Sequence, residues 1–452
     1  MVTKEQPRNA SKLMTIYAIP RMGSALLLGI VGFATFNLYT VGYQLSTFWV
    51  GTALSIGYIS IALSQFFFGW ISDKWYTRWG RRKPWIIILA PISVISFIAL
   101  LLPGIFLQSP TESVLLGWLI VWDILFQMAY AVATPYGAWL AELFTVGERP
   151  KVAQIQNIFN FVGYAIMAVF TFVVFTNFTE QLQADPGVLP PIYVMSCLIF
   201  GAIFIATFYL STFLMPIEAP PKNPPRLINN LKNIWHNRNY LFVVLLQGIA
   251  SLAWIITATV MLNYTEIVLA FGTLEYILAG ATLVLGIILF MYIWRKIIAG
   301  KGKKEGLLTL FLAAGFILSC SVIGIVPFSS TLVFGILFVA GIAFSLAGWY
   351  LISGIWYADL AEDDEKKTDD LKAGLYTGFP SIVLNLFQAL GTFILGIITS
   401  LPDIAVGTLT FSIGYLLWGP ICAAFLLVAY FYADRFIRLD FEWEKVPKQE
   451  PP

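Results

Sequence analysis

Residues 69–85 read Gly-Trp-Ile-Ser-Asp-Lys-Trp-Tyr-Thr-Arg-Trp-Gly-Arg-Arg-Lys-Pro-Trp, a basic stretch that separates two long apolar runs. The other basic residues fall in alternate connections between apolar runs, and the intervening connections, near residues 45, 110, 180, 270, 328 and 402, carry none of the 27 Lys and Arg residues. Positive charge marks the cytoplasmic ends of membrane helices. The alternation therefore predicts twelve crossings with both termini in the cytoplasm.

Composition also indicates a membrane protein. Charged residues make up 12% of the chain, about half of the roughly 25% that is usual in soluble domains. Each of twelve apolar runs reaches the roughly 20 residues that a membrane helix needs. The runs are 22–44, 46–71, 85–107, 113–141, 154–176, 190–215, 239–265, 273–297, 306–327, 331–357, 374–400 and 404–434. We expect an all-α, multi-pass integral protein of the plasma membrane, surrounded by the lipid bilayer and without a nucleic-acid partner.

The chain divides into two similar halves. A proline-rich connection at 216–238 separates 22–215 from 239–434, and we expect 1–21 and 435–452 to be cytoplasmic segments. Trp139-Leu-Ala-Glu-Leu in the first half returns as Trp356-Tyr-Ala-Asp-Leu in the second, 217 residues later (356 − 139). Two pseudo-symmetric six-helix bundles with a site between them near the bilayer midplane are typical of transporters.

The stretch 69–85 resembles the signature of the major facilitator superfamily. Its Arg78-Trp-Gly-Arg-Arg-Lys-Pro-Trp form is similar to that of the glycoside–pentoside–hexuronide:cation symporters, which include the melibiose carriers, and of plant sucrose carriers. Ala358-Asp-Leu-Ala-Glu and Gly374-Leu-Tyr are similar to a second element of that family. The resemblance implies the major facilitator fold and alternating access, with a cytoplasmic gate formed by Asp73, Arg78, Gly80, Arg81, Arg82 and Asp359.

The charged residues that hold sodium and galactoside in the melibiose carriers are replaced in this sequence. Aligned on Gly69 and Gly374, those positions are neutral here: Ile61, Gln65, Asn385, Ala25, Ala133 and Gln156. The resemblance therefore implies a carrier that lacks both the sodium site and the charged sugar clamp of its relatives.

Asp123 is the one ionisable side chain that we predict to lie deep in the bilayer. It follows Ser113 by ten residues, roughly 15 Å along a helix, or about half the hydrocarbon thickness. A charged carboxylate there costs roughly 3 kcal/mol, so it should bind a proton readily. Gln127 and Tyr130 follow at helical spacing and make one face polar. We predict proton coupling at Asp123; the alternative is a neutral Asp that hydrogen-bonds across helices.

Neutral polar and aromatic residues mark a solute site. The 154–176 run carries Gln156, Asn160 and Tyr164, the 374–400 run carries Asn385 and Gln388, and Trp254 and Trp349 lie well inside their runs. Amides donate and accept hydrogen bonds, and aromatic rings stack on sugars. These residues therefore favour a neutral sugar site, although interhelical hydrogen bonding explains any single stripe equally well.

We predict a monomeric, proton-coupled secondary transporter of a small neutral solute such as a sugar or glycoside, with no metal, no cofactor and no enzymatic activity. An uncoupled facilitator and a lysolipid carrier remain alternatives of the same fold. A metal-dependent membrane transferase using the acids of 362–370 lacks a second acidic motif, and a non-transporting sugar sensor lacks a long cytoplasmic domain. Asn177-Phe-Thr is a glycosylation sequon expected on an outer loop.

Overall fold

The computed structural model describes residues 10–441 apart from 109, 145–147, 186, 219–236, 327–330, 354–355, 358, 361–362 and 364–378, and leaves the side chains at 73, 141–142, 149–150 and 325 undescribed. Within these residues, twelve helical segments are long and apolar enough to cross a membrane. The number matches the sequence prediction. The chain forms two compact units, Met1–Pro225 and Arg226–Pro452, and each is described by itself.

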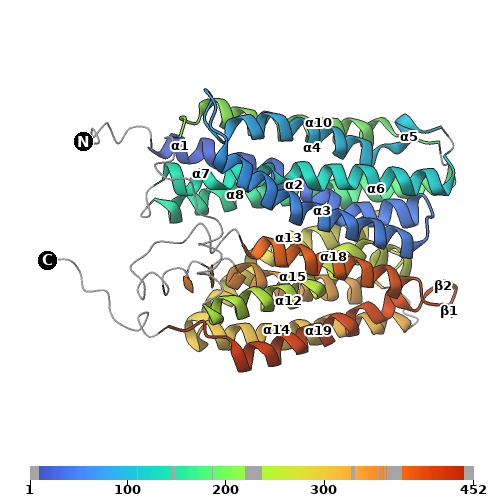
Figure 1. The fold of residues 1–452 in the computed structure, drawn as a ribbon. Coiled ribbons are helices and arrows are strands. Elements are labelled where there is room, and N and C mark those ends of the chain that lie inside the picture. The colour runs from blue at the N-terminus through green and yellow to red at the C-terminus, as the bar shows by residue number, and fades with distance from the viewer. Residues whose placement is uncertain are drawn as a thin grey trace, which may run out of the picture. The chain divides into compact units, whose positions relative to one another are not determined.

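Unit 1 contains six spans built from helices that follow each other along the chain (Figure 1). They are α1 (Ala10–Ala18) with α2 (Pro20–Asn37) and η1 (Leu38–Gly42); α3 (Thr47–Lys74); α4 (Lys83–Leu101), followed by the short α5 (Pro103–Phe106); α6 (Glu112–Ala129) with η2 (Tyr130–Val132) and α7 (Ala133–Leu143); α8 (Arg149–Val169) with η3 (Phe170–Phe175) and α9 (Thr176–Ala184); and α10 (Pro191–Leu214). Proline lies in the first turn of α2, α4, α8 and α10, where its missing N–H leaves no unmet bond.

Unit 2 repeats this order. Its spans are α12 (Arg238–Asn263) with η4 (Tyr264–Val268), α13 (Thr273–Lys301), α14 (Lys303–Ser319) with η5 (Cys320–Ile325), α15 (Leu332–Ser353), α18 (Pro380–Thr399) and α19 (Gly414–Phe436). The Asn237 side chain accepts a hydrogen bond from the backbone N–H of Tyr240, at 3.1 Å, and caps the start of α12. A hairpin of β1 (Asp403–Val406) and β2 (Leu409–Ser412) precedes α19, with Asp403 opposite Ser412.

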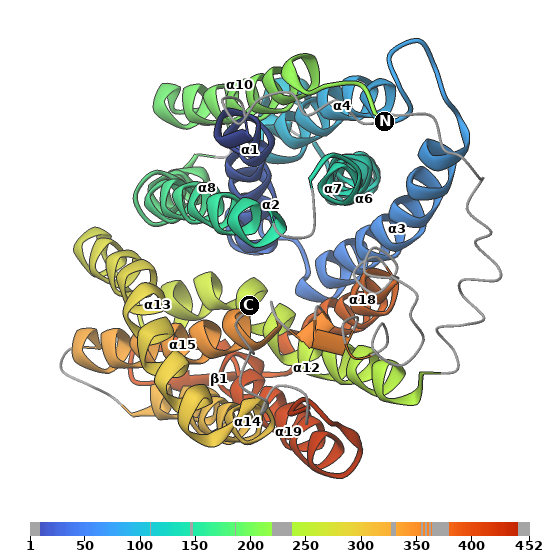
Figure 2. The ribbon, with the colours of Figure 1, turned by 90° about the vertical axis from the view of Figure 1, so that its left-hand side faces the viewer.

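The two units pack their helices in the same pairs. In unit 1, α3 packs on α6, α2 on α8 and on α10, and α4 on α6 and α10. In unit 2 the corresponding pairs are α13 with α15, α12 with α18 and α19, and α14 with α15 and α19. Figure 2 looks along the helices and shows α2 beside α8 in unit 1 and α13 beside α15 in unit 2. The internal repeat predicted from the sequence is therefore present in the packing.

Glycines allow several of these helix pairs to approach closely. A methyl group on Gly419 of α19 would collide with the carbonyl oxygen of Leu318 on α14, and one on Gly391 of α18 would collide with Ile255 of α12. On the α2–α8 pair, a methyl group on Gly163 would lie 2.5 Å from the carbonyl oxygen of Met22. Close approach of this kind is how helices associate where lipid offers no hydrophobic drive.

The first span of each unit ends in the same unusual way. Both η1 and η4 are single turns of π-helix, and each is followed by a left-handed residue that is not glycine, Gln44 (φ 57°) and Ala270 (φ 50°). In each case a backbone N–H one residue further on, from Leu45 or Phe271, returns to a carbonyl six residues earlier. The repeat therefore extends to the backbone conformation of the turns.

Three features differ from the sequence prediction. The first helix begins at Ala10 rather than residue 22, so the predicted cytoplasmic segment 1–21 is partly helical and Arg21 lies inside the span Ser11–Gly42. The last helix begins at Gly414 rather than 404, because residues 403–412 form the hairpin. The sequon lies in helix α9 rather than a loop, and the Asn177 amide already donates to the Val173 carbonyl at 2.6 Å.

We predict that Gly419→Ala destabilises the protein by about 1–3 kcal/mol, because the added methyl group must push α19 away from α14. The matched control is Gly117→Ala on α6, where a methyl group meets nothing within 4 Å and helix propensity favours alanine by up to about 1 kcal/mol. Thermal unfolding of purified protein in detergent measures both. Equal Tm values for the two variants would contradict the packing described for α14 and α19.

Candidate functional site

Asp123 is fully buried on α6, facing α3. A methyl group on Gly57 of α3 would collide with its carboxylate oxygen, so the carboxyl occupies space that only glycine leaves free. The carboxyl therefore lies between two helices of one unit, whereas the sequence suggested a side chain that faces a cavity. The reason is that Gly57 lets α3 approach this face of α6.

The carboxyl of Asp123 has no hydrogen-bond partner among the residues that the structure describes, and the same holds for the carbonyl oxygen of the neighbouring Gln127. Tyr39 and Tyr58 lie close enough to interact with Asp123 electrostatically. A charged carboxylate buried in this way is costly, whereas a carboxylic acid is neutral and carries a donor. The arrangement is therefore suited to holding a proton.

The other predicted polar residues of unit 1 gather elsewhere, around Arg21 of α2. Tyr130, Tyr164 and two residues that the sequence did not indicate, Tyr17 and Tyr136, all interact electrostatically with its guanidinium. Gln156 donates a hydrogen bond to the Tyr136 hydroxyl at 2.9 Å. We call this set, completed by Ser24 beside Tyr130 and Asn160 beside Tyr164, the Arg21 cluster.

The Arg21 cluster is held together by ring and backbone contacts. The rings of Tyr17 and Tyr136 stack with centroids 4.8 Å apart, and the Tyr136 hydroxyl donates to the Tyr17 carbonyl at 2.5 Å. Gly163 brings α8 against α2 at Met22, next to Arg21. Sequence reasoning missed Arg21 because it counted every Lys and Arg before residue 22 as a marker of topology. The periodic pattern of Tyr17, Arg21 and Ser24 on one helical face was the available signal.

Unit 2 contributes an aromatic cluster. The rings of Trp254 on α12 and Trp349 on α15 lie 5.6 Å apart, and that of Trp356 lies 5.5 Å from Trp349. The Trp254 indole nitrogen is buried and, within the described residues, has no acceptor. The structure thus brings together the two tryptophans that the sequence selected and leaves one indole N–H available.

The predicted pair on α18 is less closely connected to these tryptophans. Asn385 is buried and Gln388 is half-buried. The contacts that α18 makes with α12 run through Gly391 and Gly248, and no described contact joins either amide to Trp254 or Trp349. The two amides and the tryptophans therefore remain separate parts of the prediction.

A buried carboxylate organises the predicted gate in unit 1. Glu218, which follows α10, accepts hydrogen bonds from the backbone N–H groups of Arg81 and Arg82 at 2.5 and 2.8 Å, and the Trp139 indole N–H lies 3.3 Å from its other oxygen. Gly80 has φ +88°, and a side chain there would press on the same carboxylate. We call this arrangement the Glu218 clasp.

Unit 2 has an equivalent clasp. Asp440, which follows α19, accepts hydrogen bonds from the backbone N–H groups of Lys303 and Lys304 at 2.7 and 3.2 Å, after the left-handed Gly302 (φ +91°). The offset from Gly80 to Gly302 is 222 residues (302 − 80), and that from Glu218 to Asp440 is also 222 (440 − 218). The sequence therefore carried this repeat, but in a register different from the one that the tryptophan motif suggested.

The individual gate residues have unequal positions. Arg82 is buried and its guanidinium donates to the Ser72 hydroxyl at 2.7 Å. Arg78 is exposed beside the Trp79 ring. Asp359 forms an ion pair of 2.7 Å with Lys303, which ties it to the clasp of unit 2. The Asp73 side chain lies outside the described residues, as do the acids of 362–370 except Asp363.

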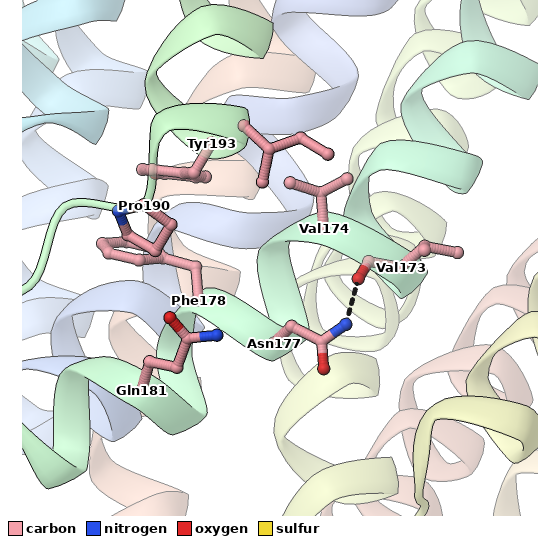
Figure 3. Close-up of a pocket in the computed structure, with 8 residues that line it drawn as sticks. Val173, Val174, Asn177, Phe178, Gln181, Pro190 and Tyr193 are labelled. Atoms are coloured by element: carbon pink, nitrogen blue, oxygen red, sulfur yellow. Dashed lines mark hydrogen bonds between the residues drawn. The ribbon is translucent and has the colours of Figure 1, made fainter.

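A separate pocket of about 260 Å³ lies between α9 and the start of α10. Figure 3 shows its lining, which is largely apolar and includes Val173, Phe178 and Tyr193, with the Asn177 amide bonded to the Val173 carbonyl. It contains none of the predicted site residues.

Comparisons with known proteins identify the family and the fold. The family described as MFS/sugar transport protein matches residues 16–434. The nucleoside transporter NupG has 13% identity and a TM-score of 0.61 over 94% of this chain and 98% of that one. A D-xylose-proton symporter has 14% identity and a TM-score of 0.62, covering 95% and 97%. A bacterial homologue of the human lysosomal transporter Spinster, inward-facing and unoccupied, has 13% identity and a TM-score of 0.62, covering 96% and 98%. No curated protein sequence matches the chain.

We predict that Glu218→Ala opens the loop between α3 and α4, because it leaves two backbone N–H groups and the Trp139 indole without their acceptor. Each buried donor left unpaired costs about 1–3 kcal/mol. We expect a lower Tm and faster trypsin cleavage in the basic segment 74–83, with Glu218→Gln intermediate and the exposed Glu180→Ala unchanged. Identical cleavage rates in Glu218→Ala and Glu180→Ala would show that the clasp does not hold the loop.

Proposed function

Because the chain belongs to the MFS/sugar transport protein family, we propose that it is a secondary transporter of a small hydroxylated solute, most simply a sugar or glycoside, driven by protons through Asp123. The protein is a multi-pass integral membrane protein. We place it in the plasma membrane with both termini in the cytoplasm, as a monomer that works by alternating access. Its motifs support membership of the glycoside–pentoside–hexuronide:cation group within this family.

The observation that carries the proposal is the carboxyl of Asp123, fully buried between α3 and α6. Taking up a proton removes a charge from an apolar space, and releasing it creates one. Any rearrangement that hydrates the α3–α6 contact would therefore change the proton affinity of the carboxyl. Coupling requires such a difference between two states, because a ligand shifts a conformational equilibrium only by its differential affinity.

Protons are favoured over sodium by the residues at hand. The positions that correspond to the sodium-binding aspartates of melibiose carriers are Ile61, which is buried, and Gln65. Sodium needs several oxygen ligands, and among the described residues no group of three or more His, Cys, Asp or Glu side chains is arranged to hold a metal ion. A single isolated carboxyl suits a proton better.

The tryptophan cluster supports a ring-bearing solute. Trp254 and Trp349 offer adjacent aromatic faces and a free indole N–H within unit 2, and apolar sugar faces stack on such rings. A solved symporter of the same fold carries D-xylose with protons according to its description, which makes a pentose or hexose a reasonable first probe.

Asp123→Asn should abolish solute-driven alkalinisation in proteoliposomes while exchange of labelled solute continues, since the amide preserves the packing against Gly57 but cannot carry the proton. Uptake is measured with mono- and disaccharides, with and without a pH gradient. The matched control is Glu112→Gln, at the exposed start of the same helix. Retention of full proton coupling by Asp123→Asn would exclude this residue as the coupling site.

Trp349→Ala should raise the KM for a transported sugar about tenfold, because an aromatic contact is worth roughly 0.5–1.5 kcal/mol beyond its buried area. The exposed Trp75→Ala serves as the control, and initial uptake rates over a range of sugar concentrations give KM and maximal rate separately. An unchanged KM in Trp349→Ala would remove the tryptophan cluster from the solute site.

A further inference from the structure

Arg21 is an arginine placed inside a membrane span. It follows the start of the span Ser11–Gly42 by ten residues, and its side chain reaches Tyr164. Tyr164 lies 15 residues into α8, which is about 22 Å along the helix. The guanidinium therefore lies well within the bundle and not at the end of a loop.

The groups around Arg21 are all neutral. Four phenols surround it, and the amides of Gln156 and Asn160 complete the cluster. Phenols and amides accept hydrogen bonds but do not balance a positive charge. Throughout the described ranges, neither an ion pair nor a hydrogen bond is found at the Arg21 guanidinium.

An uncompensated guanidinium at this position has an energetic cost. Arginine in a membrane span is unfavourable by roughly 2.5–3.5 kcal/mol at the centre, and such residues pair with another group or face water. Arg21 is half-buried, in contrast to the buried Tyr17 and Tyr136 beside it. It is therefore accessible to a small ligand, while its neighbours form a fixed wall.

We propose that the Arg21 cluster binds an anionic oxygen group, a carboxylate or phosphate, on the transported solute, with the surrounding phenols and amides binding the solute's hydroxyl groups. The guanidinium offers five N–H donors in a planar fork that matches such groups. This inference rests on the proposed transport function and specifies its substrate class. It replaces the neutral solute expected from the sequence, which did not place Arg21 inside the bundle.

A charged solute also gives the proton at Asp123 a physical purpose. Moving one negative charge into a compartment that is negative inside is opposed by about 2.3 kcal/mol per 100 mV. One proton carried with a monoanion makes the transported charge zero. Arg21 and Asp123 belong to the same unit, one for the anion and one for the proton.

The test uses the full chain in detergent and in proteoliposomes. Binding is measured by thermal shift and calorimetry with matched probes: D-glucose, D-gluconate, D-glucuronate, D-glucose 6-phosphate and lysophosphatidylglycerol. We expect at least one anionic probe to bind ten or more times more tightly than D-glucose. Arg21→Gln should weaken that probe at least tenfold, Arg21→Lys should weaken it less, and D-glucose should be unaffected. The exposed Arg295→Gln on α13 is the matched control.

The outcomes separate the two proposals. Arg21-dependent anion binding without flux of any probe would support the site while removing the proposed transport function. Arg21-dependent binding of lysophosphatidylglycerol alone would support the site and assign its anion to a lipid headgroup. Equal binding of D-glucose and all anions, or no anion binding by the wild-type protein, would overturn the proposal. Because Arg21→Lys keeps the charge, and because probe competition in the wild-type protein needs no variant, misfolding of Arg21→Gln leaves the test decisive.

Discussion

A polar group inside an apolar helix bundle must find a partner there or remain at a cost, and this constraint organises the whole protein. Most polar side chains in the spans satisfy it locally: Thr257 and Thr265 bond to carbonyls of their own helices, as do several serines. Against this background, Asp123 and Arg21 are exceptions, because the bundle supplies no partner for either. Groups that the fold leaves unsatisfied are the ones available for a ligand or a proton.

At the ends of the helices the same constraint produces the two clasps. The sharp turns before α4 and α14 turn backbone N–H groups away from any helix, and a carboxylate from the chain that follows the sixth span of each unit accepts them. Charge-assisted hydrogen bonds to backbone N–H groups are among the stronger ones. Each unit thus ties its third span to the chain that leaves its sixth, and in unit 2 the ion pair of Lys303 with Asp359 extends this connection towards the segment after α15.

Much of this architecture was readable from the sequence. The placement of basic residues predicted twelve spans, and the motif at 69–85 predicted the superfamily, because both follow from chemistry that acts locally. Depth could not be predicted as well: Arg21 looked like a loop residue, since only the structure shows that the helix begins at Ala10.

Side-chain direction was also beyond the sequence. Gln127 and Tyr130 are three residues apart on one predicted face, yet Gln127 lies beside Asp123 and Tyr130 beside Arg21. The α6 helix ends at Ala129 and continues as a 3₁₀ turn, which changes the angle between successive residues. Glu218 was missed for a different reason, because its partners are backbone N–H groups, which leave no trace in the sequence.

The turns after η1 and η4 have a consequence for how each unit moves. A left-handed residue with a Cβ costs roughly 1–2 kcal/mol relative to glycine, yet Gln44 and Ala270 adopt this conformation in both units. Residues with a side chain have fewer accessible backbone conformations than glycine. The connections from η1 to α3 and from η4 to α13 are therefore rigid corners, and bending within either unit must occur elsewhere along the chain.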